Sequence, residues 1–171
     1  MTHNSDYGNS NHGNPNIDTS ETVEARLDRL VAWYGDGADG TAPTRAQWRA
    51  LLERPSDQAV TVVNFFKLRR RAVYPEDAEA TKTSGISGKE AFDRYAAVSG
   101  PTLEKVGGRF LLLAPFEAAL MGAAEDWDLV VVGTYPDSEA LLALHEDADY
   151  RSVYPHRSGA LERQKVFACS A

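Results

Sequence analysis

The sequence predicts an α+β domain that follows a helical pair and a polar N-terminal segment. Short stretches rich in β-branched and aliphatic residues alternate with longer stretches whose apolar residues recur at helical spacing. The chain has 171 residues and 43% of them are hydrophobic, which suits one ordinary domain with an extension. Within residues 58–171 the predicted order is strand, helix, strand, strand, helix, strand.

The N-terminal third divides into two parts. Residues 1–20 are rich in Asn, Ser and Gly and offer almost nothing to bury, so we expect a disordered tail. Residues 21–57 predict two amphipathic helices: the first ends at Gly35, and the second begins after the N-cap residue Thr44 and ends at Pro55. We expect this pair to pack on the main domain or on a partner subunit.

The main domain begins with the stretch "QAVTVVNFFKL", which is apolar at both sets of alternate positions. A strand of this kind is covered on both faces of its sheet. The next element is a helix, because Ser87 and Glu90 have the spacing of a capping box and Gly107 provides a helix end.

The second half predicts a hairpin, a helical segment and a last strand. "GRFLLLAPFEAALMG" and "WDLVVVGTY" form the hairpin, and "KVFACS" forms the last strand. The helical segment between them has one or two pieces, because Pro155 favours a break near Tyr154 but is also compatible with a helix that begins there. This order is the ferredoxin-like one. Helices cover only one face of such a sheet, so we expect a homodimer through the other sheet face.

Composition and motifs exclude several function classes. The net charge of −7 disfavours a nucleic-acid partner. No apolar run approaches the length of a membrane span and no signal peptide is recognisable, so we expect a cytoplasmic protein with no membrane partner. We expect no metal, since there is no H-E-x-x-H motif or Cys cluster, and no cofactor, since the nucleotide-binding glycine patterns are missing.

Four blocks of this sequence resemble the DUF1330 family, which belongs to the dimeric α/β-barrel superfamily. They are "VVNFFKL", "AFDRYAAVSGPTLEKVGGRFLL", "EDWDLVVVGTYPDSEALLAL" and "DADYRSVYPHRSGAL". The resemblance implies two ferredoxin-like subunits that pair their sheets into a barrel, but it implies no reaction. The wider superfamily includes cofactor-independent monooxygenases and isomerases. The N-terminal helical pair and the loop 69–86 depart from the compact family pattern.

Asn64 is the most informative single position for a binding site. It lies in a strand that is apolar on both faces, where an unpaired amide costs roughly 1–3 kcal/mol. Both a structural hydrogen bond and an amide that faces a ligand remain open. In the related monooxygenases the substrate lies between helix and sheet, so the resemblance implies that Asn64, Tyr95 and Tyr150 line a cavity. We add Tyr74, from the long loop, and Tyr154 to the candidate substrate-binding residues.

The candidate catalytic residues are His156, Arg157 and Tyr150. On a continuous helix, Tyr150, Tyr154 and Arg157 share one face because they are four and three residues apart. His156 or Tyr150 is the candidate proton-transfer group, and Arg157 offers a fork for a carboxylate or enolate. The alternative is structural: aromatic packing, with a surface salt bridge to Glu162 or Asp149.

These observations support two functional hypotheses. The first is a small-molecule enzyme that uses no cofactor and catalyses proton transfer, isomerisation or oxygenation of an aromatic or enolisable substrate. The second is a non-catalytic dimeric module that binds a ligand or a protein, with the N-terminal helical pair as the interaction surface.

Overall fold

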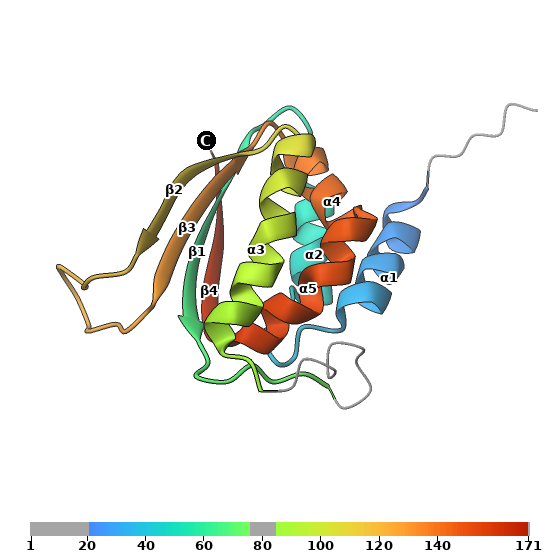
Figure 1. The fold of residues 1–171 in the computed structure, drawn as a ribbon. Coiled ribbons are helices and arrows are strands. Elements are labelled where there is room, and N and C mark those ends of the chain that lie inside the picture. The colour runs from blue at the N-terminus through green and yellow to red at the C-terminus, as the bar shows by residue number, and fades with distance from the viewer. Residues whose placement is uncertain (1–20, 76–84, 171) are drawn as a thin grey trace, which may run out of the picture.

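The computed structural model describes residues 21–75 and 85–170 (Figure 1). The predicted tail and part of the predicted loop lie outside these ranges. The described elements are α1 (Val23–Tyr34), α2 (Arg45–Leu52), β1 (Val60–Leu68), α3 (Gly88–Lys105), β2 (Arg109–Pro115), β3 (Leu129–Tyr135), α4 (Ser138–Glu146), α5 (Ala148–Ala160) and β4 (Leu161–Ser170).

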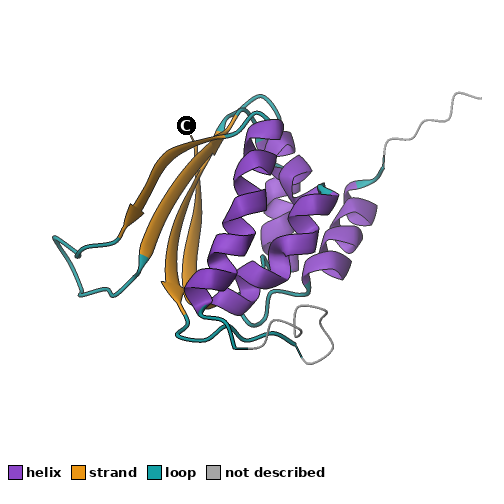
Figure 2. Ribbon diagram, viewed as in Figure 1, coloured by secondary structure: helices purple, strands orange, loops and turns teal. Residues whose placement is uncertain are grey.

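The four strands form one antiparallel sheet in the order β2-β3-β1-β4. The helices all lie on one side of this sheet (Figure 2). The βαββαβ order and the α+β, ferredoxin-like fold are therefore confirmed. Within the described ranges, no helix is long and apolar enough to cross a membrane.

The helix ends follow local side-chain chemistry. Thr44 and Ser87 both form capping boxes, with Gln47 and Glu90 as the reciprocal partners. The second crossover is in two pieces, but the break lies at Asp147 and not near Tyr154. The Asp147 backbone is extended and its carboxylate accepts the first free amides of α5, while Pro155 lies inside that helix.

The N-terminal helical pair packs on α4 of its own chain. Leu27 and Leu30 of α1 and Trp48 of α2 form a buried cluster with Leu142 of α4. At the end of α1, the Tyr34 hydroxyl donates a hydrogen bond of 2.5 Å to the carbonyl oxygen of His145. The pair therefore forms one wall of the space between the helices and the sheet.

Alternation along the strands separates an inner face, which the helices cover, from an outer face. Val63 of β1 pairs with Val132 of β3, and Val132 pairs with Leu112 of β2, so these side chains share the outer face. Leu112 is 46% exposed, and no helix of the described chain covers this face (Figure 1).

We predict that Gly88→Ala destabilises the protein, because β1, α3 and α5 meet at this residue. A Cβ atom here would lie within 3.0 Å of the carbonyl oxygens of Arg69 and Ala160. The Arg69 N–H donates a 2.8 Å hydrogen bond to the Ala160 carbonyl oxygen, which holds these two residues in place. Overpacking of this kind typically costs about 1–3 kcal/mol. Urea denaturation should show this loss of unfolding free energy.

The matched control is Gly100→Ala, in the same helix. Apart from its chain neighbours, which include Pro101, its Cβ would meet only one Phe110 ring atom, at 3.8 Å, and alanine is favoured over glycine in a helix by about 1 kcal/mol. This variant should be neutral or more stable. Equal losses in both variants would contradict this account of the junction.

Candidate functional site

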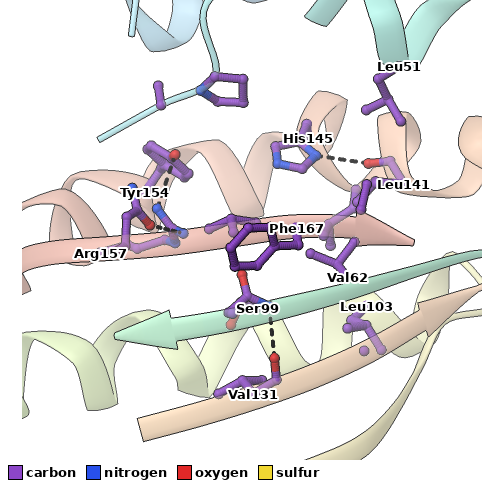
Figure 3. A pocket seen from close by; sticks show the side chains of 18 of the residues that line it. Leu51, Val62, Ser99, Leu103, Val131, Leu141, His145, Tyr154, Arg157 and Phe167 are labelled. Atoms are coloured by element: carbon purple, nitrogen blue, oxygen red, sulfur yellow. Dashed lines mark hydrogen bonds between the residues drawn. The ribbon is translucent and has the colours of Figure 1, made fainter. Parts of the chain in front are cut away.

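A cavity of about 810 Å³ lies between the inner face of the sheet, α3, α4, α5 and the N-terminal helical pair. Most of its lining is aliphatic or aromatic, and polar groups reach it at a few positions (Figure 3). The apolar lining includes Leu51, Val62, Phe66, Phe92, Val131 and Leu141. A large apolar cavity with a few polar groups is typical of a small-molecule site.

The Arg157 guanidinium lies in the wall of this cavity and is only 7% exposed. Its Nη2 donates to Gln164 Oε1 at 2.6 Å, and its Nη1 donates to the Thr41 carbonyl oxygen and to the Tyr154 hydroxyl, both at 3.3 Å. The cation also lies 5.2 Å from the centre of the Phe66 ring. All of these partners are uncharged.

Arg157 forms no ion pair with any carboxylate of the described chain. The salt bridge to Glu162 or Asp149 in the structural alternative is therefore wrong, whereas its aromatic packing is present, with the ring centres of Tyr150 and Tyr154 at 6.0 Å. The reason is that the face shared by Tyr150, Tyr154 and Arg157 points inward, so the guanidinium lies on the cavity side of α5 and not on its solvent side.

His145, at the end of α4, also lines the cavity. Its Nδ1 lies 2.9 Å from the Leu141 carbonyl oxygen, which accepts only from a protonated nitrogen and so assigns the proton to Nδ1. Nε2 then carries a lone pair, and it has no hydrogen-bond partner within residues 21–75 and 85–170. The imidazole is enclosed by aromatic rings, with the Trp48 ring centre at 5.0 Å and that of Tyr150 at 5.3 Å.

Burial lowers the pKa of His145 to about 4, against the raising effect of the Leu141 carbonyl, and the charge of Arg157 lowers it further. The imidazole is therefore neutral at neutral pH. His145 is not among the candidate site residues selected from the sequence. Its spacing of four from Leu141, on an apolar stripe, was the available signal.

The hydroxyls of Tyr95 and Tyr150 meet at 3.0 Å, and both residues line the cavity, as the resemblance implies. Burial raises the pKa of Tyr150 well above its usual value. Tyr150 is therefore a neutral hydrogen-bonding group near pH 7 and not a base. Tyr154 is the third of the four predicted tyrosines to line the cavity, and its hydroxyl donates to the Thr41 carbonyl oxygen at 2.8 Å.

Asn64 both forms a structural hydrogen bond and lines the cavity. Its Nδ2 donates to the Val131 carbonyl oxygen of the neighbouring strand at 3.0 Å, which is a structural hydrogen bond. The residue also lines the cavity, and its Oδ1 has no hydrogen-bond partner in the described part of the chain.

The structure does not bring His156 and Tyr74 into this cavity. His156 Nδ1 lies 2.9 Å from the Tyr74 hydroxyl, and neither residue belongs to the cavity lining. The helical geometry of α5 explains the position of His156, because successive helical residues point about 100° apart and Arg157 is the one that faces the cavity. Among the described residues, no three His, Cys, Asp or Glu side chains gather in a way that could hold a metal ion.

Comparison with known proteins gives a family. The domain of unknown function DUF1330 matches residues 81–169, which is more than half of the chain. The protein belongs to the DUF1330 family. No curated protein of known function matches the chain.

Solved structures of similar proteins also lack an assigned function. One is RPA0582, a protein of unknown function from Rhodopseudomonas palustris, with 28% identity, a TM-score of 0.67, and coverage of 77% of this chain and 95% of that one. The structure of methylated RPA0582 has the same identity and TM-score and is covered over 93% of its length.

The DUF1330 match and the cavity overlap only in part. Tyr95, His145 and Arg157 lie inside the matched range, whereas Asn64 and the wall formed by α2 precede it. The cavity is therefore closed by residues on both sides of the DUF1330 boundary.

We predict that His145 makes the stability of the protein depend on pH. Its folded-state pKa of about 4 lies below the ordinary 6.5, so the unfolded chain binds the proton more tightly and stability falls as pH drops from 6.5 towards 4. The loss from this residue between pH 7 and pH 5 is about 2 kcal/mol. Urea denaturation at both pH values should show a flatter dependence for His145→Gln.

The comparison variant is His156→Gln, because this histidine lies outside the cavity and burial lowers its pKa by less than that of His145. It should leave most of the pH dependence in place. An unchanged pH dependence in His145→Gln would contradict the assignment of a buried, neutral imidazole.

Proposed function

We propose that the cavity is the active site of an enzyme that acts on a small enolisable anion and uses protein groups alone. The observation that carries this proposal is the buried Arg157 guanidinium, whose partners among the described residues are all neutral. A buried charge without a counter-ion costs several kcal/mol. A ligand carboxylate or enolate would supply that counter-ion, and the planar fork of arginine suits it.

The chemistry that fits this site is proton transfer at a carbon next to a carbonyl group. His145 Nε2 is an uncharged acceptor and takes the proton, while the electron pair of the broken C–H bond moves onto the carbonyl oxygen. The Tyr95–Tyr150 hydroxyl pair and Arg157 stabilise the resulting enolate. Return of the proton to the enolate oxygen gives the enol and completes a keto–enol isomerisation, and cofactor-free oxygenation of an enolate begins with the same proton removal.

An anion bound at Arg157 would also make His145 a stronger base. The positive charge of Arg157 lowers the pKa of His145 in the free protein. A ligand anion offsets that charge, so the pKa rises when the substrate is bound. The substrate thus helps to activate the base that acts on it.

The second candidate is a module that binds the same kind of ligand without turnover. The low pKa of His145, about 4, supports it, because a weak base removes a proton from carbon slowly. The two candidates differ in one measurable respect, since both require anion binding and only the enzyme exchanges substrate protons.

We also propose that a second copy of the chain covers the outer face of the sheet. The support is the row of apolar side chains, including Leu112, that no helix of the described chain covers. A cytoplasmic location suits a chain with one cysteine, since a reducing compartment needs no disulfide.

Phenylpyruvate tests the enzyme proposal, because it joins a carboxylate and an aromatic ring to an enolisable carbon. We expect the protein to accelerate deuterium exchange at that carbon, followed by NMR in deuterated water. His145→Gln should slow exchange at least about a hundredfold while the ligand still binds, whereas Arg157→Met should lose binding.

His156→Gln separates this assignment from the sequence-based one and should leave exchange intact. A large loss in this variant, with normal exchange in His145→Gln, would contradict the role of His145. Binding without exchange in the wild-type protein supports the second candidate. Absence of both binding and exchange contradicts the proposal.

Leu112→Glu tests the homodimer. A carboxylate in the middle of an apolar interface is left without a partner, so we expect a dimer for the wild-type protein and a monomer for the variant by light scattering. Val23→Glu, an exposed apolar position at the start of α1, is the matched control and should stay dimeric. A wild-type monomer would contradict the proposal.

A further inference from the structure

A second arginine lines the same cavity without a partner. Arg54 follows the end of α2, and its Nε and Nη2 atoms are covered by protein and form no hydrogen bond within the described ranges, so Nη1 is the guanidinium nitrogen left to contact a ligand. Like Arg157, it forms no ion pair with a carboxylate in the described ranges. Removing guanidinium nitrogens from water without replacing their hydrogen bonds is unfavourable, so such groups call for an explanation.

Arg54 and Arg157 lie near opposite ends of α2. Arg157 donates to the Thr41 carbonyl oxygen, just before α2 begins, and Arg54 lies just after α2 ends. The eight residues of α2 span about 12 Å. Figure 1 shows α2 running along the helical layer, so the two positions are separated along the sheet.

The wall between these two positions is mainly apolar. Leu51, Leu141 and Val62 line it on three different elements (Figure 3). The Trp48 indole nitrogen, in the same wall, is buried and has no hydrogen-bond partner in the described part of the chain. The cavity lining therefore contains two guanidinium groups without an ion pair in the described ranges, an indole donor without a hydrogen bond there, and an apolar middle.

We propose that Arg54 is a second anion-binding residue, so that the ligand is a dianion with an acidic group at each end of an apolar middle. This inference rests on the proposed function, which places the first anionic group at Arg157. It defines the substrate class more narrowly as dicarboxylates, or carboxylates that bear a second acidic group.

Sebacate and decanoate test this proposal, because both are straight ten-carbon acids and only sebacate has a carboxylate at each end. Isothermal titration calorimetry of the full chain should show about tenfold tighter binding of sebacate. In Arg54→Gln the order should reverse, since the second carboxylate then loses its partner but still loses water. Arg54→Lys should keep part of the preference for sebacate.

Two further variants complete the design. Arg70→Gln removes one positive charge from an exposed position outside the cavity and should change neither affinity. Arg157→Met should weaken both ligands. The proposal is overturned if sebacate binds no tighter than decanoate, or if Arg54→Gln leaves the preference unchanged, and in both cases the site at Arg157 still stands. If neither ligand binds, the proposed function fails together with this inference.

Discussion

The hydrogen bonds of the Arg157 guanidinium connect three separate parts of the chain. The side chain starts on α5, reaches the Thr41 carbonyl oxygen in the connection between α1 and α2, and binds Gln164 on β4. Gln164 in turn donates to the Gly40 carbonyl oxygen at 2.5 Å. These hydrogen bonds join the connection before α2 to α5 and β4, beside the apolar packing of α1 and α2 on α4 that holds the N-terminal helical pair in place.

A protein optimised for stability alone would not bury a guanidinium among neutral partners. An apolar residue of similar size at Arg157 would avoid the desolvation cost, and Tyr154 would still donate to Thr41 O. Functional sites commonly retain such unfavourable groups because the ligand needs them. The neutral imidazole of His145 fits the same pattern, since it loses solvation to the aromatic rings around it and keeps one acceptor nitrogen for a ligand.

The elements of the fold were predictable because each depends on local chemistry. The capping box at Ser87 and the double-sided apolar pattern of β1 use only neighbouring residues, and the i, i+4, i+7 spacing places Tyr150, Tyr154 and Arg157 on one face. The break at Asp147 was missed because Pro155 is the stronger sequence signal, although the Asp147 side chain caps the next helix.

The site was predictable only in part, because the cavity is built by contacts between distant segments. His145 and Arg54 face the cavity only because α1 and α2 fold back onto α4, and nothing in the local spacing of either residue reports that contact. Conversely, the proximity of His156 to Arg157 in the sequence suggested a shared site, but successive helical residues point in different directions.

The unfolding free energy of the ligand-free Arg157→Met variant tests the central claim most directly. If the guanidinium is an unpaired charge kept for a ligand, its replacement by an apolar side chain leaves the stability unchanged or increases it, as measured by urea denaturation. If the variant instead loses about 2 kcal/mol or more, Arg157 is a structural residue whose hydrogen bonds to Thr41 and Gln164 stabilise the fold, and the account is contradicted.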